Sequence, residues 1–134
     1  MMRPGVKRRP KPSSEAEQQY KADLAVAGRR AELLDAAREA ESLLRQAQAR
    51  HAPNPEIRRL AENLDAALTE AMRAAYAAQR AEIGPRGYDD RIYRRKARAT
   101  PKVHALTAEA EHLLTLRENH RLTGIPAVPF EPAS

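Results

Sequence analysis

The stretch that decides the fold is residues 52–84, which read APNPEIRRLAENLDAALTEAMRAAYAAQRAEIG. Its apolar residues recur at alternating intervals of three and four, which is the spacing of one face of an α-helix. That face consists of Ile57, Leu60, Leu64, Ala67, Ala71, Ala74, Ala78 and Ala81. We therefore predict one long helix with a coiled-coil-like seam, and the alanines of its C-terminal half should let a neighbouring backbone come close.

A second helical pattern precedes this stretch. The sequence SEAE at residues 14–17 has the form of a capping box, in which Ser14 caps the helix and the glutamate three residues later reaches back to it. Apolar residues then recur at helical spacing to about His51, interrupted at Gly28, where we expect a kink or close packing. Because the following turn is very short, with Asn54 as the expected N-cap, the two helices should form an antiparallel hairpin.

Two further helices are predicted in residues 84–124. The sequence GPRG at residues 84–87 should end the long helix, and a short helix should run from Asp89 or Asp90 to Ala99. Thr100 then caps a final helix, which should end at Gly124 in the left-handed conformation. The expected fold is all-α, with a flexible basic tail at residues 1–13, the hairpin at 14–83, the basic segment and C-terminal helix at 84–124, and an extended Pro-rich tail at 125–134.

The composition predicts a small hydrophobic core. The chain has 27 alanines but only 22 residues of Leu, Ile, Val and Phe together, and buried alanine removes little apolar area from water. We therefore expect the hairpin to bury its seam against a second copy or a larger assembly. The candidate interface residues are Leu34, Leu44, Leu64, Ala67, Ala71, Ala74 and Ala78.

The positive charge is confined to two segments. The net charge is +6, yet residues 1–12 alone carry five cations and no acid, and residues 84–102 carry a further net charge of +5. The rest of the chain is therefore mildly acidic. The candidate nucleic-acid-binding residues are Arg3, Lys7, Arg8, Arg9 and Lys11 in the tail, and Arg91, Arg94, Arg95, Lys96, Arg98 and Lys102 in the internal segment.

If residues 88–99 form one helix, the arginines of the internal segment share one face. Tyr88, Ile92 and Ala99 then share the opposite face and should pack against the body. The arginine face is suited to the phosphates of DNA or RNA, and the segment has no Asn or Gln of the kind that reads bases, which favours non-specific contact. In the alternative interpretation the same face is balanced by acidic side chains of the hairpin. Candidates for that balance are Glu62, Asp65 and Glu70.

Several classes of protein are disfavoured. The chain has no cysteine, no apolar run long enough for a membrane span and no apolar region of a secretory signal, so we expect it in the cytoplasm or in an intracellular or virion nucleoprotein assembly. No phosphate-binding loop, nucleophile elbow or metalloprotease motif is present, so we expect neither an enzyme nor a cofactor. His104, His112 and His120 lie eight residues apart and point in different directions, and Glu109 with His112 supplies only one half of a di-iron motif.

These observations favour a non-enzymatic helical assembly protein that contacts nucleic acid without sequence specificity, such as a bacterial or phage nucleoprotein, a virion component or a DNA-packaging component. The alternative is a protein-interaction module, an adaptor or antitoxin-like hairpin, whose basic helix binds an acidic protein. A sequence-specific DNA reader ranks below both, because base-reading side chains are missing from the basic segment.

Overall fold

A computed structural model describes residues 11–124, and every regular element in this range is helical. The elements are α1 (Ser14–Ala27), α2 (Arg30–Ala49), α3 (Asn54–Ile83), α4 (Arg86–Asp89), α5 (Arg91–Arg98), α6 (Pro101–Asn119) and a π-helical turn, η1 (His120–Gly124). The all-α prediction is confirmed for these residues. The predictions for the first ten residues and for residues 125–134 lie outside them.

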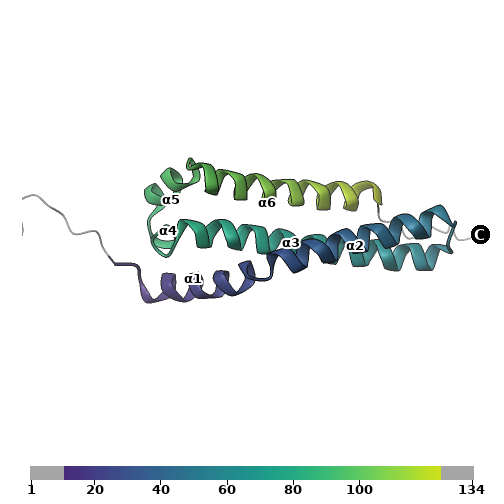
Figure 1. Cartoon of the computed structure of the whole chain (residues 1–134), viewed down its shortest axis with the longest axis horizontal. Helices are drawn as coiled ribbons and strands as arrows, with labels where there is room; N and C mark the ends of the chain where they lie inside the picture. Colours follow the sequence, from purple (N-terminus) through teal and green to yellow (C-terminus); the bar gives the residue numbers. More distant parts are fainter. Residues whose placement is uncertain (1–10, 125–134) are drawn as a thin grey trace, which may run out of the picture.

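Helix α3 is the centre of the molecule (Figure 1). It packs against α1, α2 and α6. The antiparallel pairing of α2 with α3 confirms the predicted hairpin. Since an antiparallel hairpin returns the chain to where it began, α1 starts at the end of the molecule where α3 finishes, and α4 and α5 lie at that end.

The core lies between α3 and its neighbours α2 and α6. Its buried members are Ala37, Leu44, Ala61, Leu64, Leu68, Ala71, Ala75, Ala110 and Leu113. Most of them are alanine, whose short side chain lets the helices approach closely but buries little apolar area per residue. The core of the described residues is therefore rich in alanine, as the composition indicates.

Most of the residues predicted to form the interface lie in this internal core. Leu44, Leu64, Ala71 and Ala74 are buried within the chain itself, whereas Leu34, Ala67 and Ala78 are half-buried. The first four cannot form a docking surface, which corrects that part of the prediction. The reason is that α3 has neighbours on two sides, so the chain's own helices cover the residues that the sequence pattern left open.

Three helix boundaries differ from the prediction. Ser13, not Ser14, caps α1, and its hydroxyl accepts a hydrogen bond from the Ala16 amide at 3.1 Å. The first helix does not continue to His51. It ends at Ala27, and a second helix, α2, begins at Arg30. Asn54 is the first residue of α3 and makes no capping hydrogen bond.

The residues with positive φ also differ from the prediction. Gly124 was the expected left-handed residue, but it belongs to a π-helical turn, and Gly84 has the positive φ of 96° instead. His51 has φ 53° after α2. There the amides of His51 and Ala52 donate to the carbonyls of Gln48 and Ala47, which closes α2 with the hydrogen bonds of a Schellman motif.

Candidate nucleic-acid interface

The short helix α5 carries most of the predicted internal cations. It begins after Asp90, whose carboxylate accepts a hydrogen bond from the Tyr93 amide at 2.9 Å. This backbone hydrogen bond, helped by Arg86, holds the pKa of Asp90 below its usual range. Asp90 therefore remains charged at neutral pH and stabilises the start of α5.

The predicted packing face of this segment was wrong. Asp90 has extended backbone angles (φ −117°, ψ 102°), so α4 and α5 are separate helices and Tyr88 does not share a face with Ile92. Ile92 is 69% exposed and Ala99 is also exposed. Tyr93 lies half-buried on the inner side of α5 instead.

The predicted arginine face does exist. Arg91, Arg94, Arg95 and Arg98 line a recess of about 350 Å³, and no other residue of the range 11–124 contributes to it. Arg94 donates to the carbonyl of Gly87 at 2.9 Å and is half-buried. The other three are exposed, and within residues 11–124 none of the four pairs with a carboxylate. This helix therefore presents concentrated positive charge without an internal counter-charge.

Two of the three remaining cations of the segment, Arg86 and Lys102, form ion pairs within the chain. Arg86 pairs with Asp90 at 3.2 Å and lies over the ring of Tyr93, with its guanidinium carbon 4.5 Å from the ring centroid. Lys102 pairs with Glu82 of α3 at 3.2 Å. Lys102 was a candidate nucleic-acid-binding residue, and its ion pair directs it toward α3.

The acidic side chains proposed to balance the arginines are engaged elsewhere or are distant. Asp65 accepts hydrogen bonds from Arg121 at 2.7 and 3.2 Å, and Glu70 pairs with Arg73 at 3.0 Å. Glu62 forms no ion pair among the described residues. Among the described residues, these three acidic side chains therefore form no ion pair with the arginines of α5.

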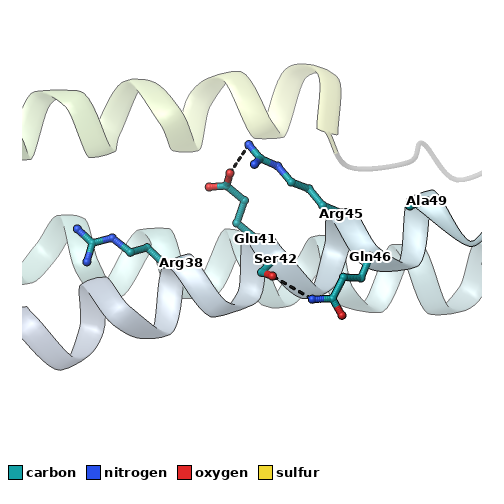
Figure 2. Close-up of a pocket in the computed structure, with 6 residues that line it drawn as sticks. All are labelled: Arg38, Glu41, Ser42, Arg45, Gln46 and Ala49. Atoms are coloured by element: carbon teal, nitrogen blue, oxygen red, sulfur yellow. Dashed lines mark hydrogen bonds and ion pairs between the residues drawn. The ribbon is translucent and has the colours of Figure 1, made fainter.

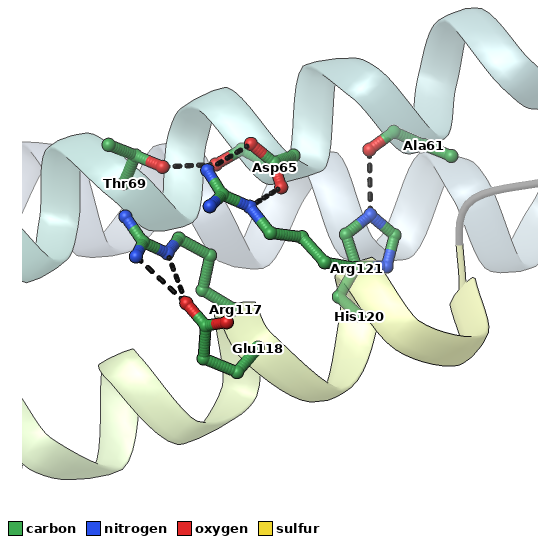
Figure 3. Close-up of polar contacts among 7 residues, drawn as sticks. All are labelled: Ala61, Asp65, Thr69, Arg117, Glu118, His120 and Arg121. Carbon is green, nitrogen blue, oxygen red and sulfur yellow. Dashed lines mark hydrogen bonds and ion pairs between the residues drawn. The ribbon is translucent and has the colours of Figure 1, made fainter.

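Figure 3 shows how the Asp65 contacts hold η1, which follows α6, against α3. Beside Arg121, the Nε2 atom of His120 lies 2.7 Å from the carbonyl oxygen of Ala61. The hydrogen bond from Arg121 holds the pKa of Asp65 below its usual range, against the opposing effect of partial burial. The contact with the Ala61 carbonyl also joins His120 to α3 within the fold.

A second recess, on α2, has a different character. It measures about 360 Å³ and is lined by side chains of that one helix (Figure 2). Its polar groups satisfy one another, because Arg45 pairs with Glu41 and the Gln46 amide donates to the Ser42 hydroxyl at 3.0 Å. No set of groups converges there on a ligand.

Residues 11–124 contain neither a metal-binding cluster nor a membrane-spanning helix. No three acidic or histidine side chains in this range gather as a metal site would require, and Glu109 pairs with Arg30. None of the helices in the same range is both long and apolar enough to cross a membrane.

No family model, curated protein or solved structure matches this chain. Among the predicted binding residues, the structure brings together the four arginines of the recess and separates Lys102 from them. Lys96 is exposed on α5, and Lys11 is exposed before α1. Arg3, Lys7, Arg8 and Arg9 lie outside the described residues.

Proposed function

We propose that this chain is a non-enzymatic helical assembly protein that binds the phosphate backbone of nucleic acid through α5, without reading base sequence. The observation that carries the proposal is the recess formed by four arginines that have no carboxylate partner among the described residues. A guanidinium group binds phosphate through paired hydrogen bonds and keeps its charge at any physiological pH. A bacterial or phage nucleoprotein, a virion component or a DNA-packaging component would use such a helix.

A salt series tests this function. Binding of the purified chain to a duplex DNA and to a structured RNA should fall about 10³-fold between about 50 and 200 mM salt if about six phosphates are neutralised. Light scattering on the same samples would give the mass of the complex. Absence of binding to either nucleic acid at about 50 mM salt, where phosphate contacts are strong, would overturn the proposal.

Two triple variants make the test specific to α5. Replacing the α5 arginines (Arg91, Arg95 and Arg98) by Gln removes three charges, and the slope of log K against log salt should fall by about 2.7. The matched control replaces the hairpin arginines (Arg38, Arg45 and Arg59), which are also exposed, by Gln. Equal losses in the two variants would show that binding follows net charge and not α5.

The exposure of Ile92 favours a second candidate. An isoleucine that is 69% exposed beside arginines has the form of an apolar anchor surrounded by charge, which suits a protein partner with an acidic surface. Replacing Ile92 by Ala should leave nucleic-acid affinity unchanged if the first proposal holds. A protein complex that Ile92→Ala weakens would favour the interaction module instead.

A further inference from the structure

We infer that α5 binds nucleic acid with unpaired bases, holding phosphates at the arginine recess and one base in a second recess on the opposite face of the same helix. This inference rests on the proposed function and names the kind of nucleic acid that the site takes. The second recess, here called the tyrosine recess, measures about 520 Å³. Its lining includes Arg86, Asp90, Ile92, Tyr93, Lys96 and Ala97.

The helical repeat places the two recesses on opposite faces of α5. Successive residues are turned by about 100°, so the average direction of the α5 residues that line one recess is about 180° from that of the other set. The exposed side of the helix between the two recesses carries Arg95 and Lys96. Since a helix with its side chains is only about 10–12 Å across, a strand that crosses this side can reach both recesses.

The tyrosine recess combines a flat aromatic surface with polar groups. The guanidinium carbon of Arg86 lies 4.5 Å from the centroid of the Tyr93 ring, and the ion pair with Asp90 holds this guanidinium in place. Ala97 adds apolar surface, and Lys96 adds a hydrogen-bond donor. Unpaired bases stack on aromatic rings and on guanidinium planes, while their polar edges form hydrogen bonds. The lining therefore matches a base.

The charges of the two recesses assign the base and the phosphate to different faces. The Tyr93 amide and Arg86 hold the pKa of Asp90 below its usual range, so the tyrosine recess contains a charged carboxylate that disfavours a phosphate or an acidic side chain. Arg86 is already paired with that carboxylate at 3.2 Å. The arginine recess, in contrast, is lined by four cations. Phosphate is therefore favoured there, and a neutral base is favoured beside Tyr93.

Duplex DNA cannot use the tyrosine recess in the same way. Its bases are paired and stacked inside the double helix, and removing one from the stack is unfavourable. A single strand presents its bases without that cost. Because every base has a π-face, such stacking tolerates any sequence, which agrees with the absence of Asn and Gln from residues 84–102.

Two strands with equal numbers of phosphates test the inference. The probes are a short oligothymidylate and an abasic strand of the same length, whose sugar–phosphate backbone carries no bases. The wild-type protein should bind oligothymidylate about 5- to 150-fold more tightly, which is the range for stacking of one base on an aromatic side chain. Both affinities should fall with salt at the same slope, because the phosphates are the same.

A variant that fills the tyrosine recess shows where the base binds. Ala97→Leu adds volume there without changing the charge, and it should reduce the affinity for oligothymidylate to nearly that for the abasic strand. The matched control is Ala99→Leu, since Ala99 is exposed directly after α5 and lines neither recess. It should bind both strands like wild type. Affinity for duplex DNA should change with neither Ala97→Leu nor Ile92→Ala.

Equal affinity of the wild-type protein for the two strands would overturn the inference and leave the proposed function in place. This comparison needs no variant, so it decides the question even if Ala97→Leu does not fold. A preference for oligothymidylate that persists in Ala97→Leu, with its fold verified by circular dichroism, would place the base elsewhere and also overturn the inference. Absence of binding to both strands and to duplex DNA at about 50 mM salt would instead overturn the proposed function itself.

Discussion

Arg80 of α3 donates to both carboxylate oxygens of Asp23 in α1, at 2.8 and 3.1 Å. The Tyr88 hydroxyl of α4 donates to the same carboxylate, so one acidic side chain joins three helices at the end that carries α5. Partial burial opposes ionisation of Asp23, but the two donors outweigh it and lower its pKa. Burial, followed by the hydrogen bond to Asp23, raises the pKa of Tyr88.

Replacing Tyr88 by Phe should destabilise the fold by about 1.5–3 kcal/mol, because a charged acceptor loses one of its donors while the ring still packs. Urea unfolding monitored by circular dichroism would measure the change. Tyr20→Phe is the matched control, since Tyr20 is also half-buried and donates no hydrogen bond among the described residues. An equal loss in both variants would assign the effect to the removal of any half-buried tyrosine hydroxyl and not to the Asp23 contact.

The Asp65–Arg121 pair should make stability depend on pH in the acidic range. The pKa of Asp65 is lower in the folded chain than its usual value, so the pair contributes fully above that usual value, near 4. The contribution is lost as pH falls through the lowered folded pKa. We expect Asp65→Asn to reduce the melting temperature at pH 7 and to have a smaller effect at about pH 3.

Asp35→Asn is the control for this pH dependence. It removes a carboxylate from the Asp35–Arg38 pair, whose side chains are about three-quarters exposed. Such a surface pair contributes little at either pH. If Asp65→Asn were as mild as Asp35→Asn at pH 7, the contact between η1 and α3 would not stabilise the fold.

The hairpin could be predicted because its signals are local. The apolar spacing of α3, its end at Gly84 and the start of α6 after Thr100 each depend on neighbouring residues, whereas the end of α1 before Gly28 was expected only as a kink or close packing. The core could not be predicted to the same degree. The repeat that contains Ala71 and Ala74 identifies one buried stripe, but Ala61, Leu68 and Ala75 are also buried because α6 folds back onto α3, and no local pattern indicates that contact.

Replacing Ala74 by Leu should destabilise the fold by about 1–3 kcal/mol, because Ala74 is 0% exposed and its neighbours leave no room for a larger side chain. Ala66→Leu is the matched control, since Ala66 lies in the same helix but is exposed. Thermal unfolding of both variants would measure the difference. An Ala74→Leu variant that melts like wild type would show that α3 is not packed this closely.

The candidate site was predictable in its charges but not in its shape. The arginines of α5 share a face because their spacing is helical, as expected from the sequence. The break at Asp90 changed which side of α5 faces the body and left Ile92 exposed. The Asp23–Arg80 and Ser13–Asp89 contacts join residues 57 and 76 positions apart, and no local spacing indicates either pair.

The position of α5 also depends on Gly87, which is buried between α3 and α5. A β-carbon at residue 87 would overlap Cγ2 of Ile83 and would lie 3.9 Å from Cβ of Arg94. Because Ile83 is buried and branched, it cannot move aside easily. Gly87→Ala should therefore push α4 away from α3 and destabilise the fold by about 1–3 kcal/mol.

Two further variants separate this overlap from a general effect of replacing glycine. Gly28→Ala should cost little, because its β-carbon would meet its nearest neighbours at an ordinary 3.5 Å and its backbone is already helical. In an Ile83→Ala background, which removes Cγ2, Gly87→Ala should cost less than it does in wild type. An equal cost of Gly87→Ala in both backgrounds, measured by urea unfolding, would show that Ile83 does not limit the approach of α4.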